Sequence, residues 1–334
     1  MIYEFAIEPD LVARWYDRKE YLLFKETFGI KTGRFISAYP KKDWRRMVWK
    51  AFDAIPMTDI EKDNAKKNLE VLLGKLWDMA IKRISTFPEM VDWLQRAEAE
   101  HDERPFRAIL ATKNPRNKHF VIETSDLIDN GHQLWDIPDD PVVPRKAEEL
   151  AKAVSPILKK CQWAIIVDPY FDPKESRFRD TLERFLIEFK DNRCGCDTPQ
   201  IELHTGIDRC FKNWETGENR NLDDETCETQ KLTDSCRKNL PPLTPEGMTL
   251  KLKIWKRKPN GQKLHNRYIL TDLVSVSFGT GIDHAGNMDS EETDDVRRLS
   301  ETQHTHRLRE YRDTPAAFDL VGEFDVKGKG GIRR

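Results

Sequence analysis

The feature that most constrains the fold is a regular alternation of helical and strand patterns in the second half of the chain. An amphipathic helical segment at residues 145–160 precedes an apolar strand, WAIIVDPYF, at residues 163–171. Another amphipathic segment follows at residues 176–190, where apolar side chains recur every three or four residues. Helices that alternate with apolar strands indicate an α/β layer arrangement, in which ligands bind at the strand ends.

Further strands are predicted from alternating or apolar runs at residues 200–206, 250–258, 265–272 and 274–281. Between them, residues 208–247 carry many charges and three cysteines, so we interpret this segment as a polar insertion. Residues 284–305 contain too few apolar side chains to bury a face, and we expect a surface loop there.

The first part of the chain has a different pattern. We predict a mainly helical region over residues 1–130, after an opening strand at residues 2–7. Its clearest helix covers residues 59–84, where leucines recur at helical spacing. Runs typical of strands then occur at residues 107–112 and 119–124.

A domain boundary is expected where Pro, Gly, Asn and Asp crowd the chain, at residues 128–145. The length of 334 residues agrees with two domains. The second predicted domain covers residues 145–334, with the polar insertion at residues 208–247 inside it.

Composition excludes some classes of protein. The formal net charge of −2 gives no global positive field, so binding of nucleic acid would require a local basic patch. The first residues lack the pattern of a signal peptide, and no apolar run approaches the ~18 residues that cross a bilayer. We therefore expect a cytoplasmic protein without a membrane span.

Basic and aromatic side chains are interleaved near Trp44 and Trp49. One interpretation is a pair of core tryptophans beside a solvated helix face. The other is a surface that binds nucleic acid.

The cysteines allow two interpretations. Four thiolates from the polar region could hold a tetrahedral zinc ion and fold a segment that has little core of its own. The spacing is irregular and contains no C-x(2)-C pair, which favours unliganded thiols. The zinc candidates are Cys194, Cys196, Cys210, Cys227 and Cys236.

The segment LHNRYILTDLVSVSFGTGID, at residues 264–283, carries the chemical information. In a strand, His265 and Arg267 project from the same face, because side chains alternate. An imidazole beside a cation can attack a phosphate while the cation neutralises the phosphoryl oxygens. Asp272 could orient the imidazole, as a carboxylate does in catalytic triads.

The order of these residues resembles the motif H-x-K-x(4)-D-x(6)-G-S-x-N of the phospholipase D superfamily. His265, Arg267, Asp272, Gly279 and Thr280 fall at matching positions. The apolar strand that ends in Pro169-Tyr170 also resembles the strand that precedes the motif in that superfamily.

The resemblance implies a mixed sheet flanked by helices and a phosphodiesterase that needs no metal ion or other cofactor. It implies that His265, Arg267 and Asp272 are catalytic. The phosphate-binding residues that it implies are Gly279, Thr280, Asp283 and Tyr170. We expect nucleic acid rather than lipid as the substrate, since no amphipathic membrane helix is evident.

The motif occurs once. Neither His119 nor His204 is followed two residues later by Lys or Arg. In this respect the chain resembles superfamily members that carry one motif and form their site by homodimerisation. The resemblance therefore implies a homodimer.

Two departures from the motif favour a different function. Arg267 stands where the superfamily has Lys, and Ile282 stands where it has Asn. The alternative is therefore a catalytically inactive module that binds a phosphorylated ligand or a protein partner. A helical region fused to such a module also suggests a component of a bacterial defence system.

Overall fold

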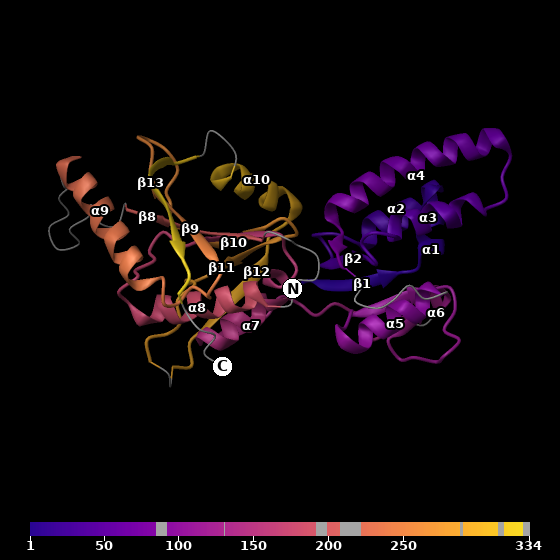
Figure 1. Ribbon diagram of the computed structural model, residues 1–334, viewed down its shortest axis with the longest axis horizontal. Helices are drawn as coiled ribbons and strands as arrows, with labels where there is room; N and C mark the ends of the chain where they lie inside the picture. Colours follow the sequence, from indigo (N-terminus) through magenta and orange to yellow (C-terminus); the bar gives the residue numbers. More distant parts are fainter. Residues whose placement is uncertain are drawn as a thin grey trace. The chain divides into compact units, whose positions relative to one another are not determined.

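The computed structural model describes residues 1–84, 92–129, 131–191, 199–207, 222–287, 290–312 and 317–329. The chain divides into two compact units. Residues 2–139 form the N-terminal unit, and the described residues from 140 onward form the C-terminal unit. Each unit contains its own β-sheet and is described by itself (Figure 1).

The N-terminal unit contains a parallel sheet with the strand order β3-β2-β1-β4-β5. Its strands are β1 (Tyr3–Ile7), β2 (Arg34–Ala38), β3 (Ile81–Lys82), β4 (Ala108–Ala111) and β5 (Val121–Glu123). Its helices are α1 (Pro9–Ala13), the 3-10 helix η1 (Arg14–Tyr16), α2 (Arg18–Thr27), α3 (Trp44–Asp53), α4 (Asp59–Met79), α5 (Trp93–Glu103) and α6 (Thr124–Asp129). Helices make up most of the regular structure of this unit, as expected, but they surround a central sheet of which the sequence indicated only β1, β4 and β5.

Both faces of this sheet are covered. Phe5 and Ile7 contribute to one apolar cluster, together with the leucines that α4 buries, and Ala6 contributes to another, together with residues of α5. In Figure 1, α5 lies on the opposite side of the sheet from α3 and α4. Such double coverage is typical of parallel sheets, because both faces must be buried.

The long helix α4 is shorter than predicted. It begins with a capping box between Thr58 and Glu61 and ends at Met79 rather than at residue 84. Ala80 adopts an extended conformation, and Ile81–Lys82 then pairs with β2. Neither β2 nor β3 was predicted, because strands of five and two residues are too short to show a clear hydrophobic periodicity.

The structure supports the core interpretation of the two tryptophans. Trp44 is fully buried, and its indole N–H donates to the carbonyl of Ile7. Trp49 is half-buried and contacts the ring of Phe52 edge-on. Trp44 is therefore not available to stack on nucleic-acid bases.

The C-terminal unit contains a mixed sheet with the strand order β13-β9-β8-β7-β10-β11-β12-β6. Its strands are β6 (Val142–Pro144), β7 (Trp163–Val167), β8 (Gln200–Gly206), β9 (Thr249–Lys256), β10 (Arg267–Thr271), β11 (Ser275–Phe278), β12 (Thr293–Arg298) and β13 (Asp319–Lys327). Strands β7, β8 and β9 are parallel, whereas every other pairing is antiparallel. The prediction of an α/β fold with a mixed sheet flanked by helices is confirmed.

Helices cover both faces of this sheet. The helices are α7 (Ala147–Leu158), α8 (Ser176–Lys190), α9 (Leu222–Asn239) and α10 (Glu301–Tyr311). Phe185 of α8 contacts Phe278 of β11, whereas Tyr311 of α10 packs against Tyr268 of β10. Because Arg267 pairs with Phe278 in the register, its side chain emerges on the α8 face.

The segment at residues 284–305 is not the surface loop that we predicted. It contains β12 and the start of α10, which a capping box between Ser300 and Gln303 opens. The helix docks through a polar contact of 2.7 Å between His304 Nδ1 and Ser275 Oγ. Of the predicted polar insertion, residues 222–239 form α9, and residues 208–221 lie outside the described residues.

Candidate functional site

Three strands bring the candidate site together at one edge of the C-terminal sheet. Tyr268 pairs with Val167, and Arg267 pairs with Phe278. Asp168, which follows β7, and Gly279, which follows β11, therefore flank Arg267 at the start of β10. This is the carboxyl edge of the parallel strands, where α/β proteins bind their ligands.

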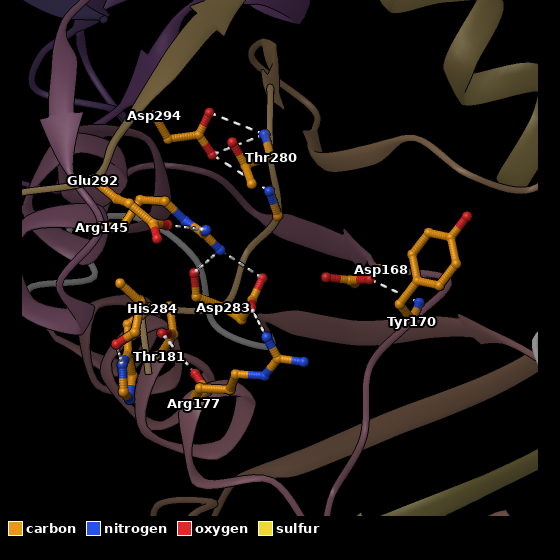
Figure 2. A network of polar contacts seen from close by, with 12 residues as sticks. Arg145, Asp168, Tyr170, Arg177, Thr181, Thr280, Asp283, His284, Glu292 and Asp294 are labelled. Carbon is orange, nitrogen blue, oxygen red and sulfur yellow. Dashed lines mark hydrogen bonds and ion pairs between the residues drawn. The ribbon is translucent and has the colours of Figure 1, made fainter. Parts of the chain in front are cut away.

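Asp168 is the buried acid of this edge. Its side chain is 1% exposed, and one carboxylate oxygen accepts the backbone N–H of Tyr170 at 2.8 Å (Figure 2). The other oxygen, Oδ2, has no partner at ordinary hydrogen-bond geometry among the described residues, although the Ile282 backbone N–H lies close enough to favour the charged carboxylate. Burial raises the pKa of Asp168 to about 6, against the lowering influence of the Tyr170 N–H and of the Arg267 charge. The carboxyl group therefore changes its charge near neutral pH.

Arg267 lies between Asp168 and an aromatic ring. Its guanidinium carbon lies 4.6 Å from the centroid of the Tyr170 ring, within the range of a cation–π contact. The Nε atom of Arg267 is buried and has no hydrogen-bond partner in the described part of the chain. Tyr170, expected from the resemblance to bind phosphate, thus holds the cation in place.

A third polar group lies alongside them. Val167 pairs with His204, so the next residues, Asp168 and Thr205, lie side by side on adjacent strands. Thr205 is fully buried, and its hydroxyl also lacks a hydrogen-bond partner among the described residues. Three buried polar atoms that could each bond a ligand thus lie at one strand edge. We refer to Asp168, Tyr170, Thr205 and Arg267 as the strand-end cluster.

His265 lies outside the strand that we expected to contain it. Strand β10 begins at Arg267, and the exposed His265 precedes it in a loop. Its Nδ1 atom lies 3.2 Å from the carbonyl oxygen of Lys263. Because a carbonyl oxygen only accepts, Nδ1 carries the proton in the neutral ring, which leaves a lone pair on Nε2.

Asp272 does not orient His265. Its carboxylate accepts the backbone N–H groups of Gln162 at 2.8 Å and Trp163 at 3.4 Å, where β7 begins. The five residues from Arg267 to Asp272 span about 16 Å in an extended strand, so the carboxylate lies at the opposite end of β10. Asp272 therefore cannot orient His265 of its own chain, and its contacts are those of a strand cap.

The backbone amides at Gly279 and Thr280 are already bonded to a carboxylate. The Gly279 N–H donates to Asp294 Oδ1 at 2.8 Å, and the Thr280 N–H lies 3.1 Å from the same oxygen. The Gly281 N–H reaches the other oxygen at 3.4 Å (Figure 2). Asp294 is 3% exposed and already bonds the backbone of Gly279 and Thr280, the two residues that we expected to bind phosphate. A phosphate would have to displace it.

Asp283 is the centre of an ion-pair network. Its two oxygens lie 3.1 Å from Arg145 and 3.1 Å from Arg177, and Arg145 also pairs with Glu292 at 2.9 Å. Figure 2 shows these groups converging between the loop after β11 and the start of α8. The network neutralises both arginines, so Asp283 is a counter-charge rather than the phosphate ligand that we expected.

No second imidazole joins the cluster from β8. The His204 side chain is fully buried, and its Nε2 atom lies 2.8 Å from Glu202. Its ring packs against Trp255 and Tyr311, on the α10 face of the sheet. Since Asp168 and Arg267 face α8, the sheet separates His204 from them.

The structure gives no support for a zinc site. Within the described residues, no three His, Cys, Asp or Glu side chains are grouped so that they could hold a metal ion. Cys236 is buried and Cys227 exposed, and neither forms a disulfide. The remaining zinc candidates, Cys194, Cys196 and Cys210, lie outside the described residues.

Of the strand-end cluster, the sequence singled out Arg267 and Tyr170 but not Asp168 or Thr205. Asp168 had a detectable signal, because it is the acid that ends an apolar strand. Arg145 and Asp294 had none, since their partners are distant in the chain, and Thr205 had none because only strand pairing brings it beside Asp168. No protein-family model matches this sequence, and no curated protein is similar enough to count as a match. None of the described helices is both long and apolar enough to span a bilayer.

Proposed function

We propose that the C-terminal unit binds and cleaves phosphodiesters through His265 and the strand-end cluster, with the chemistry of the phospholipase D superfamily. One observation carries the proposal. Three groups meet at a single strand edge. The exposed imidazole of His265 has an available Nε2 and precedes Arg267 in the chain. Arg267 in turn lies beside Asp168, whose carboxyl group changes its charge near pH 6. Nucleic acid is the proposed substrate class, since its backbone is a chain of phosphodiesters that Arg267 and an attacking imidazole can engage.

The roles of the residues follow from their contacts. His265 Nε2 attacks phosphorus, forms an N–P bond and expels the ester oxygen, while the proton stays on Nδ1, which donates it in a hydrogen bond to the Lys263 carbonyl oxygen. Arg267 neutralises the phosphoryl oxygens. Water then cleaves the N–P bond and restores the imidazole. Asp168 is a positioning residue, because its charge competes with the phosphate for Arg267.

A homodimer would complete the chemistry. An alkoxide leaving group needs a proton, and a second copy of His265 could donate it, as the resemblance implies. An aryloxide such as p-nitrophenolate leaves without a proton. Cleavage of an aryl diester therefore tests the nucleophile independently of the dimer.

The test compares cleavage of bis-p-nitrophenyl phosphate, single-stranded DNA, duplex DNA and RNA in the presence of EDTA. The wild type should cleave at least one substrate, and His265→Ala should lower the rate by about 100-fold or more. His119→Ala is the matched control, because it removes an exposed imidazole from the N-terminal unit. Equal rates for the wild type and His265→Ala would reject His265 as the nucleophile.

A specific observation favours the alternative of a phosphate-binding module without turnover. Asp294 already bonds the three amides of residues 279–281, and Ile282 is fully buried where the superfamily has Asn. This module would bind a phosphate ester through Arg267 without using His265. Binding that survives His265→Ala, is lost in Arg267→Ala and gives no product would select it.

A further inference from the structure

The N-terminal unit contains a cavity of about 580 Å³, a volume typical of small-molecule sites. It begins at Ile7 of β1 and Leu110 of β4, which pair at the carboxyl ends of their strands. The strand order reverses between these two strands, because β2 and β3 extend from β1 while β5 extends from β4. Such a reversal point is where open parallel sheets bind ligands.

Aromatic rings form much of the cavity wall. Trp15, Phe28 and Trp135 line it, and the last two contact each other edge-on with their centroids 5.8 Å apart. Arg34 contacts both the ring and the backbone of Trp135. Its guanidinium lies 4.4 Å from the ring centroid and donates to the Trp135 carbonyl at 2.8 Å. A rigid aromatic wall favours a flat, unsaturated ligand, which can stack on it.

The charged side chains of the cavity lining balance, because Arg14 and Arg34 face two glutamates, Glu20 and Glu26. Thr27 and Thr124 contribute hydroxyl groups. Glu26 pairs with Lys31 at 3.0 Å. Arg14 and Glu20 form no ion pair with another described residue. A guanidinium and a carboxylate together can donate to and accept from a heterocycle that carries both kinds of hydrogen-bonding group.

The strand ends beside the cavity do not favour phosphate. A phosphate-binding turn presents glycines and free N–H groups, whereas Glu8, Pro9 and Asp10 follow β1. The Glu8 carboxylate accepts the Thr112 N–H and hydroxyl, each at 2.7 Å. Pro9 has no N–H, and Asp10 adds a negative charge to the first turn of α1.

We propose that this cavity binds a planar heteroaromatic molecule of nucleoside size that carries no phosphate. The aromatic wall stacks on the ring, and Glu20 and Arg14 bond the polar edge. The proposal is independent of the phosphodiesterase function, because every residue that it uses belongs to the N-terminal unit.

Calorimetric titration of the full chain with adenosine, guanosine, cytidine and uridine tests the proposal, with ribose and the nucleoside 5′-monophosphates as comparisons. At least one nucleoside should bind with a Kd below about 1 mM, and ribose should not bind. The corresponding monophosphate should bind about tenfold more weakly or worse, because Glu20 and Glu26 line the cavity and repel a phosphate group.

Two variants locate the site. Leu127→Trp fills the cavity and should abolish binding, whereas Glu20→Gln keeps the shape of an exposed side chain and should weaken binding about fivefold or more. Lys25→Gln is the control, because Lys25 is exposed on the same helix as Glu20 but does not line the cavity. No binding by any of the four nucleosides would overturn the proposal. Tighter binding of the monophosphate, or unchanged affinity in Glu20→Gln and in a folded Leu127→Trp, would also overturn it.

Discussion

At the scale of single residues, the buried carboxyl of Asp168 decides the charge of the site. In the unfolded chain this group has an ordinary pKa near 3.8, whereas burial raises it to about 6 in the native state. Between these values the native state holds a proton that the unfolded chain releases. The free energy of unfolding therefore decreases as the pH rises through this window.

The variant Asp168→Asn tests this pH dependence, because an amide cannot ionise there. The free energy of unfolding of the wild type, relative to this variant, should fall by up to about 3 kcal/mol between about pH 4 and pH 7. Denaturant melts at several pH values measure the difference. Asp319→Asn, which changes an exposed carboxylate, serves as the control. If the difference in the free energy of unfolding between the wild type and Asp168→Asn did not change with pH, the pKa shift would be contradicted.

Asp272 shows why a motif can place a residue correctly along the chain and still misassign its role. The spacing from His265 matches the superfamily, yet the carboxylate bonds the backbone at the start of β7. The spacing of residues in a sequence does not show which groups a side chain contacts at the end of a strand.

We therefore expect Asp272→Ala to reduce stability by about 1–2 kcal/mol, because two backbone N–H groups lose an acceptor. Cleavage or phosphate binding by the protein that remains folded should be unchanged. Thermal melts and rates normalised to folded protein check both statements, with Asp319→Ala as the control. A large loss of rate without a loss of stability would restore the catalytic role of Asp272.

At the scale of elements, the sequence identified those that bury an apolar face. The apolar run of β7 and the amphipathic pattern of α8 were clear, because a core side chain recurs with a fixed period. Strand β12 and helix α10 were missed because polar side chains dock them, including Asp294 and His304. Such polar contacts cannot be predicted from the hydrophobic periodicity of a sequence.

The loop after β11 gives a prediction at this scale. Asp294→Ala should reduce stability by about 1–3 kcal/mol, because the amides of residues 279–281 lose their carboxylate. The same change frees those N–H groups for an anion and should tighten binding of inorganic phosphate. Calorimetry compares it with Asp294→Asn, which keeps one acceptor oxygen. Unchanged phosphate affinity in both variants would show that these amides are not part of the site.

At the scale of the whole molecule, the two units have sheets of different construction. The N-terminal sheet is parallel, with a cavity where its strand order reverses, and the C-terminal sheet is mixed, with polar groups at one strand edge. The sequence distinguished the second unit, because its helices and strands alternate regularly. The first unit was misjudged because β2 and β3 are short and lie between long helical segments.

The single copy of the motif gives a prediction about assembly. If a second copy of His265 supplies the proton for an alkoxide, the active species is a homodimer. Light scattering should then give twice the mass of one chain at the concentrations where DNA or RNA is cleaved. A monomer that cleaves DNA or RNA at full rate would show that the proton comes from elsewhere.

The most direct measurement is mass spectrometry of the protein after reaction with bis-p-nitrophenyl phosphate and an alkaline quench. An N–P bond at His265 should appear as a p-nitrophenyl-phosphoryl adduct on that residue. The adduct should be absent from His265→Ala and unchanged in His119→Ala. Release of p-nitrophenolate by the wild type without an adduct on His265, or with the same rate in His265→Ala, would contradict His265 as the nucleophile.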